Sequence, residues 1–344
     1  MNYTGLGRLN RYKLDRLLTD QERADRLDCK QRSGFEPNDA LTTIRINSTY
    51  LEVVDRWYAL KGTAVWMALL LMLPFLWLLL LFSGSIIERN ELEDWLYGVP
   101  IVMTLVGMVM AGFFLGFRLE AFRWTHYPIR LNRKTRQMHA FRQDGSVLTV
   151  PWDDLFLHTG RSHPPLAGEE QDVRAHVLDA DGETVRETVT LGYVYLGGPT
   201  AEMQLWEYLR RYMEEPDGPR DCAERTKYRN PVGERREGVV YGLVRTFASF
   251  SAWPIVSLIG SPLLALNTVG RWIAMYTSKV PQWPAEVEAA CQIDPDDPYC
   301  KDWRDNPKFG FWDLWWPLIC FAIGLTVVGW GAMKLIRELA AAAA

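Results

Sequence analysis

The chain alternates between long apolar stretches and strongly charged segments. Four stretches are apolar over roughly the 20 residues that a helix needs to cross about 30 Å of hydrocarbon. They cover residues 63–87, 98–117, 246–270 and 311–333, and they predict four transmembrane helices. The third stretch contains Pro254, Pro262 and several serines, which lower its hydrophobicity and remove backbone donors. A kinked span is the prediction for this stretch, and a re-entrant segment is the alternative.

The charges that flank these stretches predict their orientation. The short segment between the first two stretches is acidic, whereas residues 1–62 and 118–240 are rich in Lys and Arg. Because cytoplasmic segments carry an excess of Lys and Arg, both termini are expected in the cytoplasm and residues 271–310 are expected to form a periplasmic loop. Five tryptophans fall at the expected membrane boundaries, where an amphipathic ring can anchor a span: Trp95, Trp272, Trp312, Trp315 and Trp316.

Between the second and third stretches the sequence changes to the period of β-strands. Apolar and polar residues alternate in YPIRLNRKTRQMHAFRQDGSVLTVP, where Asp144-Gly145 supplies a hairpin turn. A second hairpin is predicted around Asp181-Gly182, followed by an amphipathic helix over residues 199–214. Antiparallel strands closed by one C-terminal helix follow the element order of pleckstrin-homology-like barrels. The predicted fold class is an α-helical membrane protein with four transmembrane helices and a cytoplasmic β-rich α+β domain.

These patterns divide the chain into four parts. Residues 1–48 are predicted to be a polar cytoplasmic arm. Residues 49–117 begin with a pre-membrane helix, indicated by the capping-box spacing of Thr49 and Glu52, and continue as the first transmembrane hairpin. Residues 118–240 form the cytoplasmic domain, and residues 241–344 form the second hairpin with its periplasmic loop.

Composition and cysteine positions add two expectations. The net charge of −4 disfavours a nucleic-acid-binding domain. Cys291 and Cys300 lie in the expected periplasmic loop, the compartment in which disulfides persist, so a bridge between them is predicted, with two free thiols as the alternative. Small residues in the second and fourth spans permit close helix contacts, either within one bundle or in a homo-oligomer.

Motifs of catalysis or cofactor binding are missing from the sequence. It contains no P-loop, GxSxG elbow, HExxH helix or CxxC pair. His126, His139, His158 and His163 match no metal-binding spacing and are interpreted as solvated loop residues. The spans also lack the interior ionisable residues that a transporter needs. The sequence therefore predicts a protein that is not an enzyme, with no catalytic, cofactor or metal site.

One segment resembles a known group of proteins. The stretch YPIRLNRKTRQMHAFRQDGSVLTVPWDDLFLH, with LDADGETVRETVTLG and WEYLRRYMEE after it, resembles the core of an uncharacterised bacterial membrane-protein family. Its members are encoded in type VI secretion clusters beside colicin-like effectors, and the resemblance covers about residues 45–235. It implies an immunity protein of the bacterial inner membrane, whose partners are membrane lipids and a membrane-acting toxin. A membrane-anchored scaffold that recruits an effector or a secretion component is the alternative.

Overall fold

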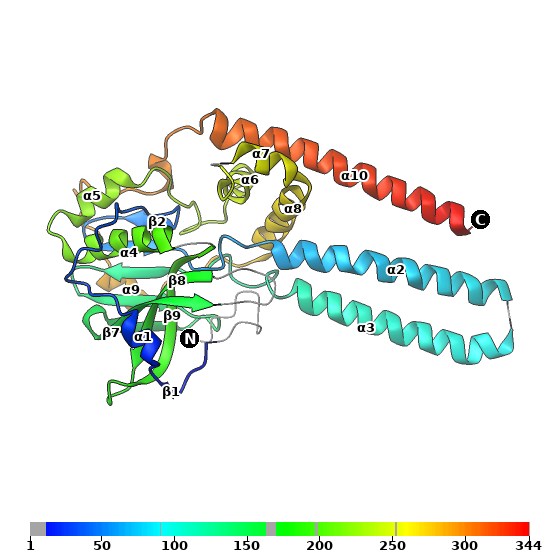
Figure 1. Ribbon diagram of the computed structural model, residues 1–344, viewed down its shortest axis with the longest axis horizontal. Helices are drawn as coiled ribbons and strands as arrows, with labels where there is room; N and C mark the ends of the chain where they lie inside the picture. The colour runs from blue at the N-terminus through cyan, green and yellow to red at the C-terminus, as the bar shows by residue number, and fades with distance from the viewer. Residues whose placement is uncertain (1–11, 90, 163–169, 197–198, 252, 344) are drawn as a thin grey trace. The chain divides into compact units, whose positions relative to one another are not determined.

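The chain forms two compact units. The computed structural model describes residues 12–89, 91–162, 170–196, 199–251 and 253–343 (Figure 1). Unit 1 takes in the described residues of Met1–Ala59, Trp124–Glu237 and Lys279–Lys308. Unit 2 takes in those of Leu60–Arg123, Gly238–Ser278 and Phe309–Ala344. Each unit is therefore built from three separate segments of the chain.

Unit 1 contains, in its described residues, two antiparallel sheets. Sheet B has the order β2-β3-β4-β5-β6, with β2 (Thr43–Ile46), β3 (Tyr50–Val53), β4 (Ile129–Asn132), β5 (Gln137–Phe141) and β6 (Val147–Pro151). Sheet A has the order β1-β9-β8-β7, with β1 (Arg16–Leu17), β7 (Leu155–Ser162), β8 (Glu170–Leu178) and β9 (Thr184–Leu196). The helices of this unit are α1 (Asp20–Ala24), η3 (Trp152–Asp154), α4 (Pro199–Glu214), α5 (Gly218–Arg225), α9 (Ala285–Ala290) and η4 (Trp303–Asp305).

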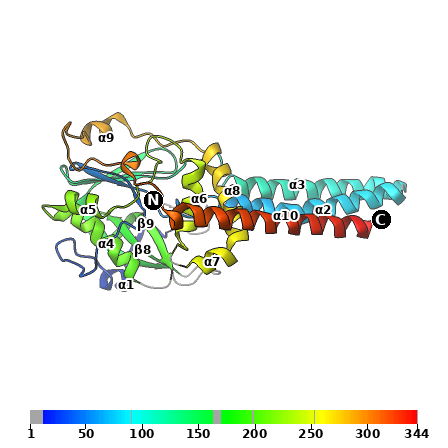
Figure 2. The same ribbon diagram turned by 90° about the horizontal axis from the view of Figure 1, so that it is seen from above.

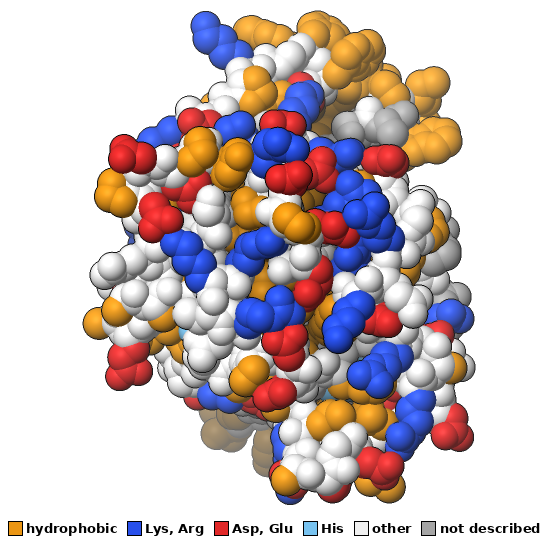
Figure 3. Space-filling view, turned by 90° about the vertical axis from the view of Figure 1, so that its left-hand side faces the viewer, with side chains coloured by type: hydrophobic (Ala, Val, Ile, Leu, Met, Phe, Trp, Pro, Cys, Tyr) orange, Lys and Arg blue, Asp and Glu red, His pale blue; other side chains and the backbone are white. Residues whose placement is uncertain are grey.

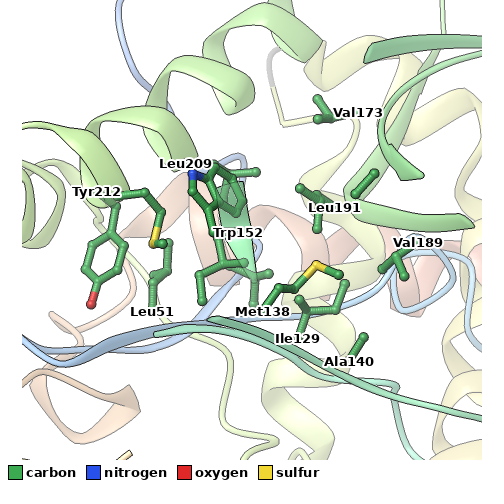
Figure 4. Close-up of a cluster of buried hydrophobic side chains, with 14 of the residues drawn as sticks. Leu51, Ile129, Met138, Ala140, Trp152, Val173, Val189, Leu191, Leu209 and Tyr212 are labelled. Atoms are coloured by element: carbon green, nitrogen blue, oxygen red, sulfur yellow. The ribbon is translucent and has the colours of Figure 1, made fainter. Parts of the chain in front are cut away.

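The main core of unit 1 is built from one face of each sheet and from α4. Successive side chains of a strand point to opposite faces, so alternate residues reach this core. The buried residues in Figure 4 include Leu51, Ile129, Met138, Ala140, Trp152, Val173, Val189, Leu191, Leu209 and Tyr212. Each large apolar side chain buried in this way stabilises the fold by about 1.5–3 kcal/mol.

The local signals of residues 127–214 agree with the structure. The chain reverses at the two Asp-Gly turns, where Gly145 and Gly182 have φ angles of +90° and +69°. Glycine adopts such angles without a steric penalty, which is why this dipeptide favours tight hairpins. The helix that follows, α4, has the same bounds as the predicted one.

The predicted helix from Thr49 is wrong, because Tyr50–Val53 form β3. This strand pairs with β2 on one side and with β4 on the other, so its register depends on residues that are far away in sequence. Asn47 closes the turn before it, since its Oδ1 accepts hydrogen bonds from the backbone N–H groups of Thr49 and Tyr50, both at 2.8 Å. The predicted polar arm also has regular structure, because its described residues contain β1, α1 and β2.

The prediction that residues 271–310 form a periplasmic loop is also wrong. Residues 279–308 belong to unit 1 and pack on the outer face of sheet B. Trp283 Nε1 donates to Glu52 Oε1 at 3.1 Å, and Lys301 forms a backbone bridge with Ile46. A segment that is part of the same folded body as the strands of residues 118–240 cannot lie on the opposite side of a membrane from them.

Unit 2 is helical. It contains α2 (Thr63–Arg89), η2 (Asp94–Gly98), α3 (Val99–Phe117), α6 (Val239–Ala248), α7 (Pro254–Ile259), α8 (Ser261–Thr277), η5 (Phe311–Trp315) and α10 (Trp316–Ala343). The helices α2 and α3 form a hairpin and lie side by side in both views (Figures 1 and 2). Glu120 caps the start of α2, since its Oε2 accepts from the N–H groups of Gly62 and Ala64 at 2.8 and 3.2 Å.

The predicted fold class, a four-span helical membrane protein, is wrong. The chain folds as a mixed α/β protein with two sheets, and two helices of the described part are long and apolar enough to cross a membrane. These are Trp95–Phe117 and Phe311–Glu338. Residues 246–270 form no single span, because Pro254 and Pro262 lie in the first turns of α7 and α8 and interrupt the helix before them.

The five tryptophans that were predicted as membrane anchors fall into two groups. Trp95, Trp312 and Trp315 are exposed. Trp272 and Trp316 instead pack against a hydrophobic cluster of unit 2, and Trp272 Nε1 donates to the backbone oxygen of Val239 at 3.0 Å. These two side chains contribute to helix packing.

Candidate functional site

The outer face of sheet A carries polar side chains that are buried. Asp172, Arg174 and His176 alternate along β8 with core residues, so they share the face that points away from the core. Thr188 and Thr190 on the neighbouring strand β9 lie on the same face, as their hydrogen bonds show. The N-terminal segment, defined here as residues 12–27, covers this face.

A capping box fixes Glu22 within this segment. Thr19 Oγ1 accepts from the N–H of Glu22 at 3.2 Å, and Glu22 Oε2 accepts from the N–H of Thr19 at 2.9 Å. This reciprocal pair begins α1 at Asp20. Arg16 on β1 donates to both oxygens of Glu22, at 2.8 and 2.5 Å. The carboxylate is thereby held against sheet A.

Two histidines from adjacent strands meet this carboxylate. His158 on β7 and His176 on β8 place their Nε2 atoms 2.8 Å apart, and His176 Nε2 lies 3.1 Å from Glu22 Oε1. The opposite ring nitrogens are also engaged: His158 Nδ1 is 3.0 Å from the backbone oxygen of Thr159, and His176 Nδ1 is 2.8 Å from Thr188 Oγ1. Both imidazole rings are therefore held in place by hydrogen bonds of their Nδ1 atoms.

The protonation of this cluster follows from its burial. Burial lowers the pKa of His158 to about 4, and it also lowers the pKa of His176 although Glu22 opposes this effect. Burial raises the pKa of Glu22, but hydrogen bonds from His176 and Arg16 outweigh this and hold that pKa below its usual value. Near neutral pH the site holds two neutral imidazoles and one carboxylate.

This composition is that of a metal-binding site. Each of the three residues offers one ligand atom, and these atoms lie within 4.8 Å of one another. Imidazole nitrogen and carboxylate oxygen are the ligands of many zinc and non-haem iron sites. The interpretation of His158 as a solvated loop residue is wrong, because it is buried on a strand.

A buried ionic cluster adjoins the histidines. Asp172 Oδ1 accepts from Arg174 Nε at 2.6 Å, and its Oδ2 lies 3.0 Å from Arg56 Nη1 and 3.1 Å from the hydroxyl of Tyr12. Gly160 on β7 makes room for this arrangement, since a Cβ atom there would lie 2.1 Å from Arg174 Nε. Tyr12 connects the N-terminal segment to this cluster. Removal of one charged partner would leave a buried charge, so the cluster holds this segment on the sheet.

The remaining predicted site residues do not come together. Cys291 and Cys300 are both free thiols, so the structure lacks the predicted bridge; Cys291 is buried on the outer face of sheet B and Cys300 is exposed. His126 and His139 are buried as well, each beside the hydroxyl of a threonine. His163 lies outside the described residues.

Two sequence features mark single residues of the site but do not link them to one another. The spacing of Thr19 and Glu22 is a capping box, which places a carboxylate at a helix start. His176 lies on the polar side of a strand with strict alternation, VRAHVL, and such a side is solvated in most single sheets. Only the return of the N-terminal segment buries it, and that return has no local signal.

A family model matches residues 106–295, which is more than half of the chain. The chain belongs to this family, a family of unknown function (DUF6708). The match begins within α3, covers β4 to β9 and ends after α9. It includes His158 and His176 but not Glu22. No curated protein and no solved structure matches the chain.

Proposed function

We propose that this DUF6708 protein is a membrane-anchored binding protein: apolar helices of unit 2 insert into a lipid bilayer and hold unit 1 at its surface, where unit 1 recruits a protein partner. This is the scaffold alternative of the sequence analysis.

The observation that carries the proposal is the apolar surface of α3. Val102 is its buried residue, whereas Met103, Met108 and Leu115 are 64%, 64% and 67% exposed. Its 19 residues span about 28 Å, close to the thickness of a bilayer's hydrocarbon core. Soluble monomers rarely expose contiguous apolar patches of more than a few hundred Å². A lipid environment accounts for this surface, and the similarly apolar α10 supports the same interpretation.

Unit 1 has the surface of a protein in water. On the face in Figure 3, Lys and Arg side chains are interspersed with Asp and Glu side chains, and hydrophobic side chains are scattered among them. Its outer sheet faces are covered by its own segments, residues 12–27 and 279–308. An immunity role would place toxin recognition in residues 88–97 and 271–310 and on the lipid-exposed faces of the spans. Residues 279–308 instead belong to the folded body of unit 1, which favours recognition by the surface of that unit.

Membrane insertion is tested by charged substitutions in α3. The double variant Met103→Arg, Met108→Arg should shift the full-length protein from the alkali-resistant membrane fraction to the soluble or aggregated fraction. Arg at the centre of a bilayer helix costs about 2.5–3.5 kcal/mol. Leu17→Arg is the matched control, because Leu17 is 59% exposed but lies in unit 1. Equal membrane retention of the α3 variant and the control would refute insertion.

Partner binding is tested by site-specific photocrosslinking in cells. A photoreactive residue at Glu36 or Asp217, both highly exposed in unit 1, should crosslink to a protein. The same residue at Met108 should crosslink to lipid. If the toxin of a neighbouring gene is captured only from positions in α3 or α10, and the protein protects cells from that toxin, the immunity role would replace the scaffold role.

A further inference from the structure

Three side chains with metal-ligand atoms converge beneath the N-terminal segment, from positions far apart in sequence. Glu22 is supplied by α1, His158 by β7 and His176 by β8. We propose that these three residues bind one divalent transition-metal ion, with zinc as the ion that the ligand set fits best. The ion would fasten the N-terminal segment to sheet A.

The first support is the number of protons that the three ligand atoms share. The backbone oxygen of Thr159 only accepts, so His158 carries its proton on Nδ1 and presents a lone pair at Nε2. The single proton on His176 Nε2 then faces two acceptors, His158 Nε2 at 2.8 Å and Glu22 Oε1 at 3.1 Å. Three basic atoms thus share one proton. A metal ion in the place of that proton would accept a lone pair from each of them.

The second support is the set of groups behind the ligands. A histidine that binds a metal through one nitrogen almost always donates its other N–H to a hydrogen-bond acceptor, such as a carboxylate, a backbone carbonyl or water. His158 donates its Nδ1–H to the backbone oxygen of Thr159. Metal binding at Nε2 of His176 would leave the proton of that ring on Nδ1, and Thr188 Oγ1, 2.8 Å away, would accept it. A carboxylate ligand is normally hydrogen-bonded as well, and Arg16 does this for Glu22.

The third support is the spacing. Ligand bonds of about 2.0–2.2 Å at tetrahedral angles place ligand atoms about 3.3–3.6 Å apart. The observed separations of 2.8 and 3.1 Å would have to open by about 0.2–0.8 Å, which small side-chain rotations can supply. Arg16 would keep its hydrogen bond to Oε2, while Oε1 turns to the metal.

Two imidazoles and one carboxylate are the ligand set of zinc sites with one open coordination position. The same set also binds ferrous iron in non-haem sites, so the chemical class is a divalent first-row transition metal. Zinc is the probe of choice because it has no redox chemistry, and cobalt is its spectroscopic substitute. The proposal is independent of the proposed function, since it concerns only contacts inside unit 1.

The test uses the full-length protein in detergent, stripped with a chelator and desalted. It should bind one zinc ion per chain, and cobalt should give the visible absorption bands of a four- or five-coordinate ion. His176→Gln and His158→Gln should weaken zinc binding at least tenfold, and Thr188→Val should weaken it about tenfold through the ring that it orients. The matched control is His139→Gln, since His139 is also buried beside a threonine hydroxyl but belongs to no group of three metal-ligand residues in the described part of the chain.

A second measurement needs no variant and therefore does not depend on variant folding. Zinc should slow amide hydrogen exchange in the peptides that contain Glu22, His158 and His176, and leave the peptides of sheet B unchanged. The proposal is overturned if the wild type binds less than one ion per chain or if the two histidine variants bind zinc as the His139 control does. Protection confined to other peptides would overturn it as well.

Discussion

Glu202 gives the sharpest test of the electrostatics around sheet A. It lies near the start of α4 and is 1% exposed, and no described residue hydrogen-bonds to its Oε1. Burial raises its pKa to about 8, and the nearby carboxylate of Asp172 adds to this effect. Arg161 and Arg174 oppose it without cancelling it. Glu202 is therefore a protonated, neutral acid in the folded protein at neutral pH.

The sign of the pH dependence follows from the proton balance. The unfolded chain releases this proton around pH 4.5, whereas the folded chain keeps it until about pH 8. Between these values the folded state binds more protons, so its stability falls as pH rises. The stabilisation is complete below pH 4.5 and is lost above pH 8. At about 1.4 kcal/mol per pH unit, the loss across this window is about 4 to 5 kcal/mol.

The substitution Glu202→Gln replaces the acid by a neutral group of the same shape. At pH 4.5 the variant and the wild type should melt together, and at pH 9 the variant should melt higher, by on the order of 10 °C. Thermal unfolding of the detergent-solubilised protein, followed by circular dichroism from pH 4.5 to 9, measures both curves. Glu224→Gln is the control, because Glu224 lies on the exposed side of α5. Parallel curves for Glu202→Gln and the wild type over the whole range would refute the reasoning.

Two further substitutions test packing in each unit. Asp172→Asn removes the carboxylate between two buried guanidinium groups and should lower the free energy of unfolding by about 3–5 kcal/mol, measured by denaturant titration, whereas Asp179→Asn at an exposed ion pair should change it little. Gly324→Leu should lower the thermal midpoint of the solubilised protein, because a Cβ atom at Gly324 would lie 2.2 Å from a backbone oxygen of α8. Gly329→Leu should not lower it, since a Cβ atom at Gly329 meets nothing within 4 Å.

Elements whose signals are local could be predicted from the sequence. The Asp-Gly turns fix two hairpins, because few other dipeptides adopt their backbone angles as readily. The helix of residues 199–214 has a regular apolar stripe, and a proline at its first position marks its start. In each case the deciding residues lie within a few positions of one another.

Elements that depend on distant partners were predicted wrongly. Residues 50–53 carry a helix-start signal, but the chain forms a strand there because β2 and β4 provide hydrogen-bond partners on both edges. Residues 279–308 are acidic and rich in proline, which is typical of an external loop, yet Trp283 and Val287 pack on sheet B. Tertiary contacts override local preference where burial and pairing favour another conformation.

The candidate site also depends on residues that are distant from one another in the sequence. No spacing rule links Glu22 to His158 and His176, because the three residues approach only after the N-terminal segment returns to sheet A. In unit 2, the length of an apolar stretch alone also led to a wrong prediction. Residues 246–270 have the composition of a span, but two prolines and Gly260 divide them into α7 and α8, and Arg271 at the far end of this region is fully buried in protein.

The order of segments links the folding of the two units. Strands β3 and β4 are neighbours in sheet B, but the whole α2–α3 hairpin separates them in the chain. The closure entropy of so long a loop opposes their pairing until the hairpin has formed and brought its ends together. Residues 279–308 come next to sheet B in the same way, after α6, α7 and α8. If α3 enters the bilayer, as proposed, its packing against α2 there promotes the closure of sheet B. Under the proposed function, this order of folding would complete unit 1 at the membrane surface.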